Sequence, residues 1–307
     1  MRKVISICSH LLILIVAAAG GAFAQNDPEW TEAFPGFRVA GNLYYVGSKG
    51  LASYLVVTPA GNILINSDME ANLPLIRASI EGLGFKFADT KILLISHAHF
   101  DHDAGSAKIK ELTGASYMVM DGDVPVVESG GKADFQYGNR AEFLYPPAKV
   151  DRALHDGDEV KLGGAVLVAH LTPGHTKGCT TWTMKVSEGG KTYNVVIVGS
   201  PNVNPGYKLV RNDAYPQIAK DYQRMFDVLK ALPCDIFLGA HGGYFGLEEK
   251  YAHREGSGRR PKAAPTSGEE KNGGANPFVD PDGYRKFVAE KEKEFRTELA
   301  KQRLAAK

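Results

Sequence analysis

One short segment of this 307-residue chain concentrates the side chains best suited to chemistry. Ser96-His97-Ala98-His99-Phe100-Asp101-His102 places four possible metal ligands within six residues, directly after the apolar residues 92–95. We call residues 97–102 the HxHxDH motif. Imidazole nitrogens and carboxylate oxygens bind zinc, and a zinc ion that keeps a coordination position open for water is typical of a catalytic site.

Two further histidines follow later apolar segments. His175 comes after residues 166–171, and His241 comes after residues 236–238. Ligands usually bind beyond the carboxyl ends of strands in α/β folds, so these histidines are expected at the same sheet edge as the motif. A strand that turns into a helix directs the motif residues to two sides, which predicts two neighbouring metal sites. The remaining histidines after residue 24, His155, His170 and His253, are expected to be structural.

The elements that must position these residues alternate between strand and helix. The expected strand-rich segments are residues 42–47, 54–57, 63–65, 92–95, 117–120, 159–186, 193–198 and 236–238. The expected helices are residues 72–83, 104–112 and 218–231, and a C-terminal helix with an apolar stripe from Tyr284 to Leu299. Because the second half echoes the first, the pattern predicts one internally duplicated α/β domain over residues 25–307. Residues 122–149 are expected to be mostly loop.

Two segments are expected to lie outside this folded core. Residues 252–277 contain no aliphatic side chain larger than alanine, which predicts a flexible surface insertion. Residues 1–24 combine Arg2 and Lys3, an apolar run and Ala22-Phe23-Ala24, a pattern typical of a cleaved secretory signal peptide. The pattern predicts a periplasmic protein without a membrane anchor; the alternative is an uncleaved anchor.

The net charge limits the partners. The chain has 36 Lys and Arg against 35 Asp and Glu, a formal charge of +1. Such a balance creates no long-range field that attracts phosphate backbones or anionic lipids. A small-molecule substrate is therefore expected, and nucleic acid is not.

The motif and the sequences around both later histidines resemble the metallo-β-lactamase superfamily. These are Thr172-Pro173-Gly174-His175-Thr176 and Gly239-Ala240-His241. Residues 200–207, which read Ser-Pro-Asn-Val-Asn-Pro-Gly-Tyr, together with Asp221-Tyr222 and residues 231–235, are most similar to the third subclass of class B β-lactamases. The resemblance covers most of the chain and implies a four-layer αβ/βα sandwich. It also implies two zinc ions, the first held by His97, His99 and His175 and the second by Asp101, His102 and His241.

The resemblance implies a function as well. A metal-activated hydroxide would attack the β-lactam carbonyl and so provide antibiotic resistance, with Asp101 orienting the hydroxide as the catalytic residue. Ser200, Asn202 and Tyr207 would hold the substrate carboxylate or the developing oxyanion. Packing is the alternative role for Tyr207.

Ser200 bears on the choice of substrate. Superfamily hydrolases of lactones, thioesters and phosphodiesters usually carry a metal-bridging Asp at this position, and a hydroxyl supplies no such charge. Ser200 therefore favours a β-lactam. The alternative, a hydrolase of a lactone, thioester or phosphoester, requires an acid from Asp213 or Asp221 to reach the metals. A second alternative is a periplasmic zinc-binding protein without catalysis.

The chain departs from the family pattern in two respects. Asn66 stands where relatives usually carry an Asp, which removes a carboxylate expected to orient a ligand histidine. Cys179 and Cys234 lack the family's usual disulfide partners, and the sequence leaves open whether they pair with each other.

Overall fold

The computed structural model describes residues 27–256 and 276–307. The predicted signal peptide, residues 1–24, lies outside these residues, as does most of the predicted insertion.

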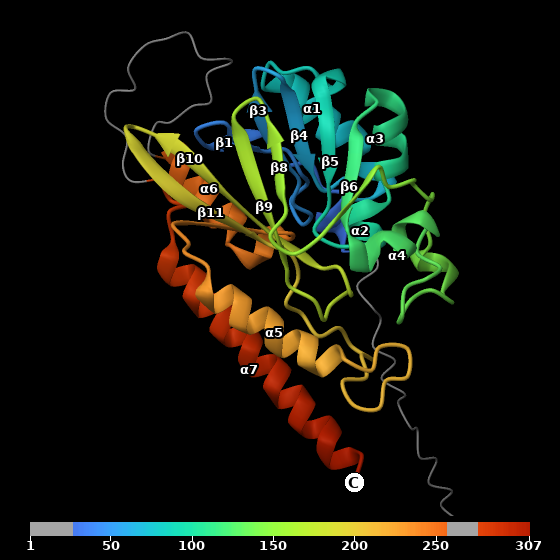
Figure 1. The fold of residues 1–307 in the computed structure, drawn as a ribbon. Coiled ribbons are helices and arrows are strands. Elements are labelled where there is room, and N and C mark those ends of the chain that lie inside the picture. Colours follow the sequence, from blue (N-terminus) through green and yellow to red (C-terminus); the bar gives the residue numbers. More distant parts are fainter. Residues whose placement is uncertain (1–26, 257–275) are drawn as a thin grey trace, which may run out of the picture.

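Two β-sheets stack face to face in the centre of the molecule (Figure 1). The first sheet has the strand order β1-β2-β3-β4-β5-β6-β7, and the second has the order β12-β11-β10-β9-β8. The strands of the first sheet are β1 (Phe37–Ala40), β2 (Leu43–Tyr45), β3 (Tyr54–Thr58), β4 (Gly61–Ile65), β5 (Thr90–Leu94), β6 (Ser116–Met120) and β7 (Arg152–Leu154). The strands of the second sheet are β8 (Glu159–Leu162), β9 (Ala165–Leu171), β10 (Thr180–Glu188), β11 (Lys191–Val198) and β12 (Ile236–Gly239).

Helices cover the outer face of each sheet. The α-helices are α1 (Leu73–Gly82), α2 (Phe100–Asp103), α3 (Ser106–Thr113), α4 (Val124–Glu128), α5 (Ile218–Ala231), α6 (Leu247–Gly256) and α7 (Pro281–Ala305). The 3-10 helices are η1 (Pro28–Trp30), η2 (Glu70–Asn72), η3 (Phe87–Asp89), η4 (Asp121–Asp123), η5 (Ala141–Phe143) and η6 (Gly242–Tyr244). Helices α1 and α3 pack on the first sheet, and α5 and α7 pack on the second. This arrangement confirms the four-layer αβ/βα sandwich.

The alternation of side chains along the central strands explains the layers. Leu55, Leu64 and Leu93 belong to the cluster beneath α1 and α3, whereas Val56 and Ile63 belong to the cluster between the sheets. Successive side chains of a strand point to opposite faces, so a strand between a helix layer and a second sheet must be apolar on both. That requirement accounts for the continuous apolar runs in the sequence.

Contacts between the sheets fix the segment in which the motif begins. The indole Nε1 of Trp182 on β10 donates to the carbonyl of Ile95 at 3.0 Å, and the backbone N–H of Thr180 donates to the carbonyl of Ser96 at 2.7 Å. Trp182 is fully buried, and burial of so large a side chain contributes roughly 2 kcal/mol or more of hydrophobic stabilisation. The second sheet therefore holds the residues just before the HxHxDH motif in place.

Most of the predicted elements are confirmed. The C-terminal helix spans residues 281–305, and Gly114, with a left-handed φ of 68°, caps the C-terminus of α3. The predicted loop at residues 122–149 contains α4. The helices that the structure describes include none long and apolar enough to cross a membrane.

The predicted insertion is wrong at both of its ends. Residues 252–256 continue α6, so His253 lies on a helix, and Arg254 is buried with its guanidinium bonded to the carbonyl of Arg38. At the other end, Asn276 donates to the carbonyl of Val39 at 2.9 Å. Composition failed here because these residues bury polar groups that have backbone partners, which a count of aliphatic side chains does not detect. Residues 257–275 lie outside the described part.

Candidate metal centre

A tight turn after β5 separates the motif residues into two groups. The backbone N–H groups of His102 and Asp103 both donate to the carbonyl of His99, at 2.9 and 3.0 Å. Helix α2 begins at Phe100, so His97 and His99 precede the turn while Asp101 and His102 lie on it. One short helix therefore directs the motif residues to two different sides, as the sequence predicts.

The structure brings the predicted ligands together at the edge where β5, β9 and β12 end. The possible ligand atoms of His97, His99 and His175 lie within 4.8 Å of one another, and so do those of His97, Asp101 and His102. The ring centroid of His97 lies 4.4 Å from that of His102 and 4.6 Å from that of His175. His97 thus belongs to both clusters.

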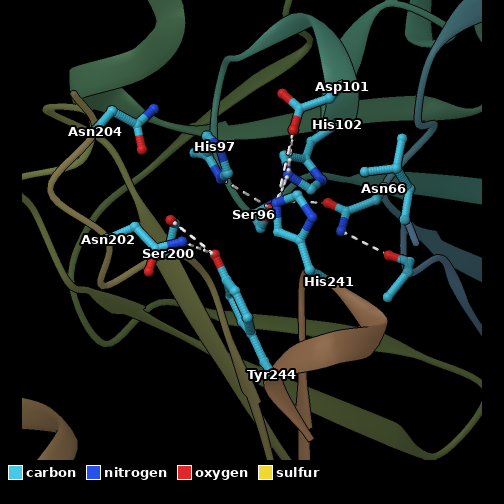
Figure 2. A network of polar contacts seen from close by, with 12 residues as sticks. Asn66, Ser96, His97, Asp101, His102, Ser200, Asn202, Asn204, His241 and Tyr244 are labelled. Carbon is cyan, nitrogen blue, oxygen red and sulfur yellow. Dashed lines mark hydrogen bonds and ion pairs between the residues drawn. The ribbon is translucent and has the colours of Figure 1, made fainter. Parts of the chain in front are cut away.

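His241 completes the second group (Figure 2). Its Nε2 lies 3.1 Å from Nε2 of His102 and 3.7 Å from Oδ2 of Asp101. Oδ2 of Asp101 also lies 3.1 Å from Nε2 of His102. The side chain of His241 is 21% exposed whereas that of His102 is 0% exposed, so solvent reaches the group from the side of His241. All six predicted residues therefore converge, although their individual ligand assignments remain predictions.

At three of these rings one nitrogen faces a protein group, and the other has no hydrogen bond to the described residues. Nδ1 of His97 lies 3.2 Å from the hydroxyl of Ser96, and Nδ1 of His175 lies 2.9 Å from the carbonyl of Asn202. His99 instead turns Nε2 toward Oδ2 of Asp134, at 3.5 Å. Metal-bound histidines usually have their second nitrogen held in this way, because that contact fixes the tautomer and the ring orientation. The residues present thus fit a metal-binding cluster.

At His97, His175, His241 and Asp101 the electrostatics favour the protonation states that bind metal, whereas at His99 burial is outweighed by Asp134, which raises the pKa of that ring. Burial and the neighbouring imidazoles hold the pKa of His97 and His175 well below the usual range, and burial lowers that of His241 to about 4. Burial opposes ionisation of Asp101, but His102 beside it lowers its pKa overall. Neutral imidazoles and an ionised carboxylate are the forms that coordinate cations.

Asn66 acts on the motif through hydrogen bonds (Figure 2). Its amide donates to the carbonyl of Ala52 at 2.9 Å, and its Oδ1 accepts from the backbone N–H of Ser96 at 2.8 Å. Asn66 thereby connects β4 with the residue directly before His97. It supplies no carboxylate, as the sequence indicated.

Asp68 is not among the predicted site residues. It provides a carboxylate close to the position of Asn66. Both of its oxygens and Nδ1 of His102 are buried without a hydrogen-bond partner among the described residues. Backbone bonds from Ser67 N–H to His102 and from Gly105 N–H to Asp68 hold the two segments together. Burial raises the pKa of Asp68 to about 6, and His102 is the strongest influence that lowers it. An acid three residues after the end of a buried strand is the signal that was available in the sequence.

We expect Asp68→Asn to weaken metal binding next to His102 by about tenfold, the lower range for losing an outer partner of a metal ligand. Asp68 has a φ of 53°, a conformation that asparagine tolerates, so the backbone should not change. Competition with a chromophoric chelator measures the affinity. Asp227→Asn, on the exposed surface of α5, is the matched control, and equal affinities for both variants would contradict the role of Asp68.

Asp123 and Asp134 also come from the segment expected to be loop. Asp123 accepts hydrogen bonds from Ala98 N–H at 3.0 Å, Thr176 Oγ1 at 2.8 Å and Gly178 N–H at 2.7 Å. It therefore joins the HxHxDH motif to the loop of His175. Nothing in the local sequence pattern distinguishes these two acids from surface residues.

The predicted substrate-binding residues divide into two groups. The side chains of Ser200 and Asn202 both contact the hydroxyl of Tyr244, whose ring lies beside that of His241 (Figure 2). Tyr207 is only 2% exposed, and its hydroxyl donates to the carbonyl of His175 at 2.9 Å. In this structure Tyr207 therefore supports the loop of His175, which corresponds to the packing alternative.

The remaining predictions concern the two cysteines and His170. Cys179 and Cys234 are both free thiols. His170 on β9 bonds to Thr183 and belongs to none of the possible ligand clusters in the described residues.

Comparison with known proteins places this geometry in a family. The profile of the Metallo-beta-lactamase superfamily matches residues 50–241, well over half of the chain. The chain belongs to the metallo-β-lactamase superfamily. Within the superfamily, it is 57% identical to the native FEZ-1 metallo-beta-lactamase from Legionella gormanii, with a TM-score of 0.83 over 89% of this chain and 98% of that one. The fold of this family is the fold that the sequence resemblance implied.

Other known proteins extend the comparison. BJP-1, a subclass B3 metallo-beta-lactamase of Bradyrhizobium japonicum, is 36% identical with a TM-score of 0.80, over 91% of this chain and 98% of that chain. The class B3 di-zinc enzyme LRA-12, from an Alaskan soil metagenome, is 35% identical with a TM-score of 0.80 over 89% and 97% of the two chains. A protein of Burkholderia pseudomallei, described as a "Probable metallo-hydrolase", is 29% identical over 51% of this chain, which covers about half of that relative (52%).

Proposed function

We propose that this protein hydrolyses the amide bond of β-lactams, uses two zinc ions for this reaction and thereby provides antibiotic resistance. The cluster of five histidines and Asp101, in a chain 57% identical to FEZ-1 over nearly all of that enzyme, carries the proposal. The di-zinc relative LRA-12 supports the identity and number of the metal ions.

Zinc bound at such a cluster lowers the pKa of water and polarises a carbonyl oxygen. The remaining tasks belong to the protein. Asp101, which is held ionised by His102, accepts a hydrogen bond from the attacking water and orients it. Ser200 and Asn202 donate hydrogen bonds to the substrate carboxylate and hold the lactam carbonyl in position for attack. The positive charge that zinc would bring to the cluster would favour binding of an anion by these two groups.

The residues after β11 support a β-lactam over the alternative substrates. Ser200 occupies the position at which the alternative hydrolases carry a bridging acid. Asp213 is exposed, and Asp221 lies beside Tyr215. Neither acid belongs to a possible ligand cluster in the described part of the chain. Neither Asp213 nor Asp221 is therefore placed to substitute for the missing bridge.

The test is a substrate panel on the purified, zinc-loaded protein. We expect it to hydrolyse a penicillin, a cephalosporin or a carbapenem, to lose this activity on chelation and to regain it with added zinc. A protein that binds two zinc ions but cleaves only a lactone, thioester or phosphoester would contradict the proposed substrate class. One that binds zinc and cleaves nothing in the panel would support the non-catalytic alternative.

We also propose that the protein is exported to the periplasm after cleavage behind Ala24. This rests on the sequence of residues 1–24. Mass spectrometry of the periplasmic fraction of a Gram-negative host tests it, since an intact N-terminus or retention in the cytoplasm would contradict export.

A further inference from the structure

Tyr244 contacts three groups of the site although no motif includes it. It ends η6, three residues after His241. Its hydroxyl lies 2.7 Å from Nδ2 of Asn202 and 3.2 Å from Oγ of Ser200. Its ring centroid lies 5.0 Å from that of His241 (Figure 2). One side chain therefore connects a predicted metal ligand with both of the remaining substrate-binding candidates.

The chemistry of these three groups gives their hydrogen bonds a direction. The Nδ2 amide of Asn202 can only donate, so the phenol oxygen of Tyr244 accepts from it. The single proton of the phenol is then available for Oγ of Ser200. When Oγ of Ser200 accepts that proton, the hydroxyl hydrogen of Ser200 is free to point toward a ligand.

The backbone of Asn202 is fixed independently of Tyr244. Its carbonyl accepts from Nδ1 of His175 at 2.9 Å and from the hydroxyl of Tyr222 at 2.6 Å. Only the side-chain torsions of Asn202 remain to be set, and the bond to Tyr244 sets them. Loss of the phenol oxygen would thus free two polar side chains without moving the loop that carries them.

We propose that Tyr244 is a positioning residue that turns the hydroxyl of Ser200 and the amide of Asn202 toward the carboxylate of the substrate. The inference rests on the proposed function for the identity of that substrate. The ligand class that Ser200 and Asn202 would recognise is an anion attached next to the chemical group that contacts the metal ions.

Binding of a matched pair of thiols tests this role without turnover. Mercaptoacetate and its methyl ester both present a thiol, a ligand that zinc accepts, but only the first has a carboxylate. We expect calorimetry on the zinc-loaded wild-type protein to show tighter binding of mercaptoacetate. In Tyr244→Phe this preference should fall about fivefold, the effect of one typical hydrogen bond, while zinc content stays unchanged. An unchanged preference would overturn the proposal.

Two further variants separate positioning from general packing. Tyr284→Phe removes a buried tyrosine hydroxyl that donates to the carbonyl of Leu229, away from the site, and should leave the preference unchanged. In Ser200→Ala, the additional change Tyr244→Phe should have a smaller effect than in the wild type, because one of its targets is gone. Equal effects in both backgrounds would show that Tyr244 does not act through Ser200.

Kinetics link the result to the proposed function. With a β-lactam substrate, Tyr244→Phe should raise KM about fivefold and change kcat less than about twofold, because the carboxylate contact persists from ground state to transition state. A loss of kcat at constant KM would overturn the positioning role. If the wild-type protein cleaves no β-lactam, the proposed function fails, and the thiol preference still decides the role of Tyr244.

Discussion

His97→Ala is expected to cause the largest loss of activity. We expect kcat/KM for a β-lactam to fall by more than about a hundredfold, because even an outer partner of a metal ligand is worth up to about that factor. His97 belongs to both clusters of possible ligands, so its loss should weaken both metal positions at once. Steady-state kinetics and the zinc content per chain measure the two effects.

The matched control is His170→Ala. His170 is a half-buried histidine on β9 whose Nε2 bonds to Thr183 Oγ1 at 2.8 Å, outside the cluster. Its replacement should retain both zinc ions and change kcat/KM less than about threefold, as expected for a residue outside the site. Full activity and two bound zinc ions in His97→Ala would refute the assignment of His97.

Asp123→Ala is expected to cause a large loss of stability. It leaves the N–H groups of Ala98 and Gly178 and the hydroxyl of Thr176 without their acceptor in a buried region. Unsatisfied buried donors each cost about 1–3 kcal/mol, so the free energy of unfolding should fall by about 3 kcal/mol or more. Urea denaturation of the zinc-free protein measures this change.

The same substitution should also weaken metal binding. Ala98 lies between the first two motif histidines, and Thr176 follows His175, so Asp123 connects two ligand-bearing segments. A Cβ added at Gly178 would lie 2.7 Å from the Asp123 carboxylate carbon, which shows how closely this loop packs around the acid. Asp123→Asn keeps one acceptor oxygen and should lose less stability. Asp121→Ala, an exposed neighbour, should change the free energy of unfolding by less than about 0.5 kcal/mol; a similar loss in Asp121→Ala and Asp123→Ala would contradict the bridging role.

The fold was largely predictable because its signals are local. Apolar runs such as residues 92–95 mark strands buried on both faces, and α7 has an apolar stripe at helical spacing. The prediction failed at Arg254 and Asn276, whose burial depends on backbone carbonyls of β1 at distant positions in the chain. Composition contains no information about such long-range partners.

Residue types and their order are enough to identify the side chains of the metal-binding cluster, since the HxHxDH motif and two histidines after apolar strands can be recognised without coordinates. How these side chains are held is a property of the folded chain alone. Asp68, Asp123 and Asp134 act on histidines or loops from separate segments, and Tyr244 on η6 reaches Ser200 and Asn202. The physical reason is that ligand identity follows from residue type, whereas orientation depends on hydrogen-bond partners that become neighbours only after the two sheets have packed together.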